Sequence, residues 1–153
     1  MLKINKNVMI NEDKIECICF YGNKPLRQIV NESRITGNIR QIKGRYGYKS
    51  IIFMSDGYLF LCPYTPEIYL SRLEDNDYFV LDSKKCIIKR SCVREIVTKP
   101  NYKQHLEIVK SKKEKDYVNL AGRNKTRYFI FTVSGRIYGL NIVKKASEVF
   151  KEG

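Results

Sequence analysis

The two halves of this chain resemble each other at a constant offset of 78 residues. The matching segments lie near both ends of each half, pairing residues 8–10 with 86–88, 49–53 with 127–131, and 56–57 with 134–135. A repeat of this length indicates that one supersecondary unit is built twice. We therefore predict a module over residues 1–73, an acidic linker over 74–77 and a diverged second copy over 78–153.

Each copy has the pattern strand, strand, helix, strand, hairpin, short helix. The hairpins are predicted at the Asp-Gly pair 56–57 and the Ser-Gly pair 134–135, because such pairs supply the positive φ of tight turns. A first helix is expected from Pro25, with a counterpart around Leu106 to Val109, and short final helices from Pro66 and over Lys144 to Phe150. These elements predict an α+β fold with a mainly antiparallel sheet.

The chain is expected to be cytoplasmic. Its N-terminus is charged and carries neither a continuous apolar signal region nor a membrane span. Its five cysteines are an odd number and lie in apolar segments, which suits a reducing compartment better than a disulfide framework. Cys17 and Cys19 share one face of a predicted strand, so we expect them to be buried as small apolar residues.

Motifs that carry enzymatic chemistry are not found. The chain has a single histidine, His105, no C-x-x-C pair, and neither of the glycine-rich phosphate-binding patterns. We predict a protein that is not an enzyme and that uses no cofactor, metal or small-molecule substrate.

The formal net charge of +13 favours a polyanionic partner. Residues 1–77 hold 11 basic and 9 acidic groups (+2), and residues 78–153 hold the other 18 and 7 (+11). In both copies the bases concentrate between the first helix and the hairpin. A solvated surface explains such a patch once, but its repetition favours a face that neutralises phosphates.

The leading contact candidates lie in and beside two glycine-containing loops that lead into the hairpins, residues 44–49 and 122–127. Glycine lets a backbone approach phosphate closely, and arginine can fork onto phosphate or guanine. The candidates are Arg40, Lys43, Arg45, Lys49, Arg123, Lys125 and Arg127. Nearby Tyr46, Tyr48 and Tyr128 either stack on single-stranded bases or pack on a sheet.

From Pro25 to Leu73 the first copy resembles the extracellular matrix regulatory proteins, the RemA-like family. The resemblance is carried by Pro25-Leu26-Arg27-Gln28-Ile29-Val30, Glu32, Arg34, Gly37, Ile51-Ile52, Gly57, Leu61, Pro66-Glu67 and Arg72-Leu73. It implies a LytTR-like module in which a basic loop before the hairpin contacts DNA. Lys125-Thr126-Arg127 stands at that place in the second copy, and Lys49 with Arg45 nearby in the first.

The resemblance also implies assembly, because family members are single modules that form rings around DNA. A homo-oligomer, either a ring or a dimer, is therefore expected, with nucleoid-associated localisation. A looser resemblance to the competence transcription factor ComK rests on Lys24-Pro25-Leu26, Gln28-Ile29-Val30, Ser33, Gly44-Arg45 and Leu59-Phe60-Leu61-Cys62-Pro63. Both resemblances imply the same class of activity.

The sequence thus favours a transcription regulator that binds double-stranded DNA through the basic loops of two tandem modules. Two alternatives stay open. The repeated module is a non-catalytic interaction unit whose charge maintains solubility, or the chain binds RNA through its tyrosines and basic loops. The operator, the regulated genes, the direction of regulation and the subunit number are not specified by the sequence.

Overall fold

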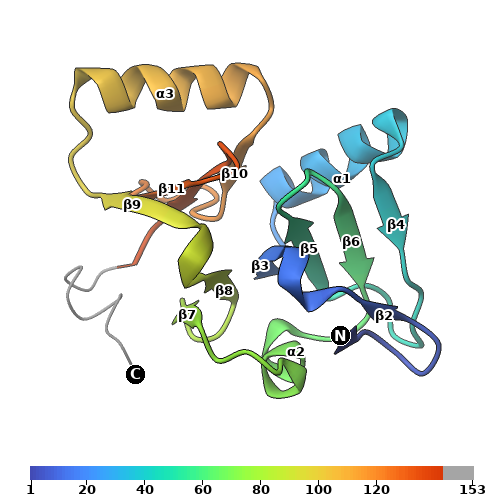
Figure 1. The fold of residues 1–153 in the computed structure, drawn as a ribbon. Helices are drawn as coiled ribbons and strands as arrows, with labels where there is room; N and C mark the ends of the chain where they lie inside the picture. The colour runs from blue at the N-terminus through green and yellow to red at the C-terminus, as the bar shows by residue number, and fades with distance from the viewer. Residues whose placement is uncertain (143–153) are drawn as a thin grey trace.

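The computed structural model describes residues 1–142 (Figure 1). The first half contains β1 (Leu2–Lys3), β2 (Met9–Ile10), the 3-10 helix η1 (Glu12–Lys14), β3 (Ile15–Phe20), α1 (Lys24–Thr36), β4 (Ile39–Gln41), β5 (Ser50–Met54), β6 (Leu59–Cys62) and α2 (Pro66–Arg72). The predicted α+β fold is confirmed.

The second half repeats this series. It contains β7 (Tyr78–Leu81), β8 (Cys86–Lys89), the 3-10 helix η2 (Arg90–Cys92), β9 (Val93–Val97), α3 (Tyr102–Lys113), β10 (Tyr117–Asn119), β11 (Tyr128–Thr132) and β12 (Ile137–Leu140). From η1 and η2 onward, each element of the second half begins 78 residues after its counterpart. The helix predicted over Lys144 to Phe150 lies outside the described residues.

Local chemistry explains where α1 and the two hairpin turns form. The Asn23 side chain caps α1 by accepting a hydrogen bond from the Leu26 amide, and Gly37 ends the helix with a φ of 79°. The hairpin turns place Gly57 and Gly135 at φ values of 92° and 96°, a left-handed conformation that favours glycine. The predicted turn chemistry is therefore present in both halves.

The strands form two main sheets and one isolated pair. The larger sheet has the order β4-β6-β5-β3-β8-β7 and the smaller β10-β12-β11-β9, while β1 and β2 pair with each other. Most neighbours are antiparallel, and the exceptions are the parallel pairs β4-β6 and β10-β12. Since β8 and β7 belong to the second half, the larger sheet crosses the boundary at 74–77, and the division into two modules there stays a prediction.

Two apolar clusters cover the faces of the larger sheet. One brings Cys17, Cys19 and Phe53 together with Ile130 and other residues of the smaller sheet, so it joins the halves. The second packs the β1-β2 hairpin and α2 on the opposite face. Figure 1 shows the two halves side by side, with α1 and α3 at the same end of the molecule. The halves thus share one continuous core.

A buried carboxylate reinforces this junction. Glu16 lies at a β-bulge in β3, where Ile15 and Cys17 pair with consecutive residues of β5, and it is fully buried. Arg136 Nη1 donates to Glu16 Oε2 at 2.9 Å, Tyr138 Oη donates to the same oxygen at 2.6 Å, and Ser134 Oγ donates to Oε1. All three donors belong to the second half, so the junction is both apolar and ionic.

Candidate nucleic-acid interface

The first basic loop, residues 42–49, connects β4 to β5 and is held at both ends. The Ile42 amide donates to Leu61 and the Lys49 amide to Cys62 at 2.9 and 2.8 Å. A side chain at Gly44 would meet Pro63, because an added Cβ would lie 2.2 Å from the proline Cβ. The turn between these anchors therefore presents Arg45 and its neighbour to solvent.

The second basic loop, residues 120–127, is held in the corresponding way. The Leu120 amide donates to Gly139 and the Arg127 amide to Leu140 at 2.8 and 2.7 Å. A turn closes where the Asn124 amide donates to Ala121, leaving Arg123 at its tip. Arg45 and Arg123, 78 residues apart, consequently occupy equivalent tips.

Both loops lie against the short turn that precedes α1. The Tyr21 amide donates to the Lys49 carbonyl at 2.9 Å, and Asn23 Nδ2 donates to the Asn119 carbonyl at 3.4 Å. Leu120 also lines a hollow with Gly22 and Lys85. The base of one loop and the start of the other are thus brought to the same edge of the molecule.

All seven predicted contact residues are exposed. Among residues 1–142, none of the seven forms an ion pair, whereas Lys84, Arg94 and Arg136 pair with glutamates. Their positive charge therefore faces solvent without compensation by a neighbouring acid. This leaves the charge available to an anionic ligand.

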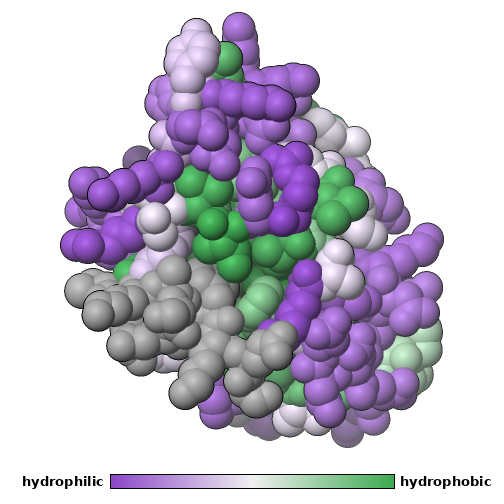
Figure 2. Space-filling model, turned by 60° about the vertical axis from the view of Figure 1, so that its left-hand side comes forward, coloured by the Kyte–Doolittle hydropathy of each residue, from purple (hydrophilic) through white to green (hydrophobic). Residues whose placement is uncertain are grey.

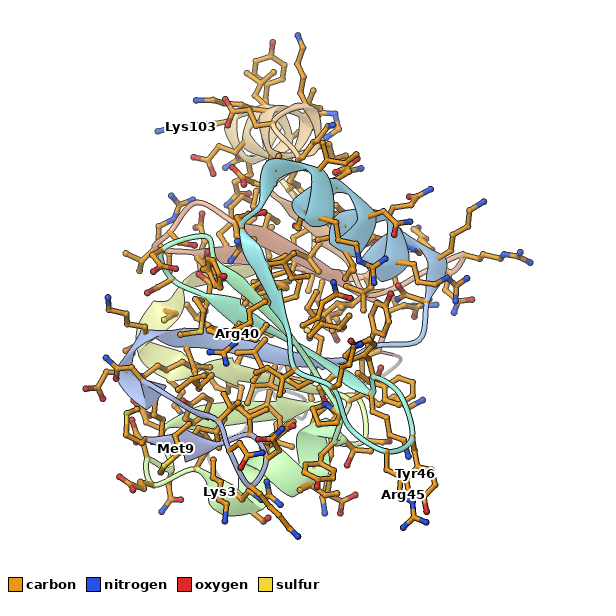
Figure 3. All side chains as sticks on the ribbon, turned by 90° about the vertical axis from the view of Figure 1, so that its right-hand side faces the viewer. Lys3, Met9, Arg40, Arg45, Tyr46 and Lys103 are labelled. Carbon is orange, nitrogen blue, oxygen red and sulfur yellow. The ribbon has the colours of Figure 1, made fainter. Side chains whose placement is uncertain are left out.

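The repeat separates these seven residues into two groups. Arg45 and Lys49 correspond to Arg123 and Arg127, so their positive charge recurs in both halves. The positions equivalent to Arg40 and Lys43 hold Val118 and Ala121, both buried. In Figure 3 Arg40 lies on β4 near the centre of one face, and Arg45 with Tyr46 projects from a distant corner.

The three tyrosines near the loops have different surroundings. Tyr46 has 76% of its surface exposed, and the Arg45 guanidinium lies 5.6 Å from the centre of its ring. Tyr48 packs against the apolar cluster that joins the halves, and Tyr128 is a buried member of it. Tyr46 is therefore the one of these three that is placed to stack on a base.

Three thiols form the potential metal-binding group within the described part of the chain. The Sγ atoms of Cys17, Cys19 and Cys86 all lie within 4.8 Å of one another. Burial raises the pKa of the Cys17 and Cys19 thiols, which disfavours the thiolate form that metals require. Hydrogen bonds from Cys17 and Cys19 lower the pKa of Cys86.

The expected burial of Cys17 and Cys19 is confirmed. The sequence analysis did not anticipate Cys86 beside them, because it joins them through the pairing of β8 with β3. Register shows this directly, since Cys19 stands opposite Cys86. Within residues 1–142, no helix combines the length and apolar character needed to cross a bilayer.

Fold and surface together define a duplicated α+β protein with exposed, uncompensated bases on equivalent loops. Residues 1–73 match the RemA-like family, described as extracellular matrix regulatory protein A-like. The resemblance of the first half to this regulatory family is therefore confirmed, while the resemblance to ComK stays a prediction. A search of curated proteins found no match to the chain.

Proposed function

We propose that the protein is a non-catalytic transcription regulator that binds double-stranded DNA through its two basic loops. The observation that carries this proposal is the recurrence of exposed, unpaired bases at equivalent positions, Arg45 with Arg123 and Lys49 with Arg127. A regulatory role also agrees with the family match of the first half.

The loops suit phosphate contacts for physical reasons. Each is anchored by backbone hydrogen bonds, so little conformational entropy is lost when its tip meets a ligand. Arginine presents a planar fork that matches two phosphate oxygens, and releasing counterions from DNA makes such contacts strongly salt-dependent. Two equivalent loops on one rigid core provide two such contact points.

Fluorescence anisotropy with random-sequence duplex DNA tests the proposal, with single-stranded RNA of equal length as the comparison. At about 50 mM salt the duplex should bind, and the affinity should fall steeply toward about 200 mM. Absence of duplex binding at the lower concentration would contradict the proposal. Stronger binding of the RNA would instead favour stacking on Tyr46.

Paired substitutions identify the surface. Replacing Lys125 and Arg127 by alanine should weaken duplex binding and lower the slope of log affinity against log salt by about two, one for each phosphate contact. The matched control replaces Lys103 and Lys113, two exposed lysines of α3, and removes the same charge. Equal losses in both variants would show that net charge, and not the second basic loop, determines binding.

A further inference from the structure

The smaller sheet ends in an edge that the larger sheet does not have. In the larger sheet β3 lies between β5 and β8, whereas its counterpart β9 pairs with β11 alone within residues 1–142. An unpaired strand edge presents backbone donors and acceptors that accept another strand. Residues 15–19 of β3 are all buried, while β9 contains no buried residue.

The chain itself shows what occupies such an edge. The β7-β8 hairpin pairs along β3, with Ile18 opposite Ile87 and Cys19 opposite Cys86. Its counterpart at the start of the chain is the β1-β2 hairpin, which forms an isolated two-stranded sheet among the described residues. The chain therefore has one open edge and one hairpin of the kind that fills it.

Both hairpins are seated on their own halves in the same manner. Ile88 of β8 clusters with Ile130 and Leu140, and the corresponding Ile10 of β2 clusters with Ile52 and Cys62. The first hairpin is thus already placed as the second one is, with the outer edge of β2 left unpaired among residues 1–142. No refolding is required for it to meet another strand.

Exposure of equivalent side chains marks the missing contact. Ile87 is fully buried between the halves, but its counterpart Met9 has 57% of its surface exposed. Figure 3 places Met9 at the periphery of the molecule. Figure 2, with the β9 side turned forward, shows hydrophobic residues gathered on that face. Both surfaces are apolar where the internal junction is buried.

The charges at the two surfaces are complementary. At the internal junction the bulge residue Glu16 meets Ser134 and Arg136 of the neighbouring hairpin turn. The equivalent bulge in β9 carries Arg94, and the residue equivalent to Ser134 is Asp56, which is exposed. Repeating the junction would bring Arg94 of one chain to Asp56 of the next, a favourable pair of opposite charges.

We propose that the protein associates head to tail with further copies of itself by repeating its internal junction. The β2 strand of one chain adds antiparallel to β9 of another, with Met9 opposite Ile96, Val8 opposite Val97 and Ile10 opposite Glu95. The contact joins two different surfaces, so it closes into a ring or extends as a filament, depending on the rotation per step. It does not depend on nucleic acid.

The first test measures mass in solution without nucleic acid, by sedimentation velocity across a concentration series. Wild-type protein should form multimers, and Met9→Glu should raise the dissociation constant by at least about 30-fold, because a carboxylate would be buried opposite Ile96. The control is Ile35→Glu on α1, where the isoleucine is 87% exposed. A monomeric wild type, or equal losses in both variants, would overturn the proposal.

The second test traps the proposed register. Val8 and Val97 stand where Cys86 and Cys19 face each other across β8 and β3, so the double variant Val8→Cys/Val97→Cys should form disulfide-linked multimers on oxidation. Figure 1 shows β2 and β9 on opposite sides of one molecule, which rules out a link within the chain. Multimers no more abundant than those of the single variants would overturn this register.

The charge pair gives a third test. Asp56→Arg and Arg94→Glu should each weaken association, and the combined variant should recover much of it because the opposite charges are restored in exchanged positions. Additive losses in the combined variant would overturn the predicted contact. Because these measurements use no nucleic acid, they stand or fall separately from DNA binding.

Discussion

Replacing Arg136 by methionine should destabilise the whole protein through Glu16. Glu16 is fully buried, and the Arg136 side chain is 11% exposed. Removing one partner of a buried ion pair costs about 3–5 kcal/mol, because the other charge is left without compensation. Ser134 and Tyr138 still donate to the carboxylate, so we expect the lower end, about 3 kcal/mol. Methionine preserves an apolar contact with Phe53, over whose ring the guanidinium lies.

Urea unfolding at pH 7, followed by far-ultraviolet circular dichroism, measures this loss. With a slope of about 2 kcal/mol per molar urea, the midpoint should fall by roughly 1.5 M. The companion variant Glu16→Gln/Arg136→Met removes both charges and should recover a large part of the stability. A single variant that loses under about 1 kcal/mol, or a double variant that loses the sum of the two single losses, would refute this account of the junction.

Two further predictions concern the hairpin turns and the cysteines. Gly57→Ala and Gly135→Ala should each lower the free energy of unfolding by about 1 kcal/mol or more, because alanine disfavours their positive φ; unchanged thermal midpoints would contradict this. With a thiol-specific reagent, one cysteine should react rapidly in the native protein and four after unfolding, since Cys92 alone among the five is partly exposed. Burial raises the pKa of Cys92, so its labelling rate should still increase at pH 9, whereas a plateau below that pH would contradict the assignment.

Local sequence signals predicted most of the individual elements. The Asp-Gly and Ser-Gly pairs located both hairpins, and the apolar pattern from Pro25 located α1, which the structure begins one residue earlier at Lys24. These features depend on neighbouring residues, so one segment contains the information that specifies them. The offset of 78 residues then transferred each prediction from one half to the other.

Strand partners were not predictable in the same way. The alternation within β8 indicates which face is buried, but nothing in residues 86–89 indicates that β3 lies beside them. The burial of Glu16 was missed for a related reason, since its three donors lie 118 to 122 residues away. Of the predicted site, the structure gives exposure and position for all seven bases, but their contacts with DNA stay a prediction.

The β7-β8 hairpin puts the repeat in sequence out of phase with the repeat in structure. A segment that ends at residue 73 contains one full sequence copy, yet it lacks the strand that covers β3. During synthesis, the first half cannot close its sheet until residues 78–89 have left the ribosome. The natural folding unit is therefore the first copy together with the opening hairpin of the second, and a truncation for expression should be placed after Lys89.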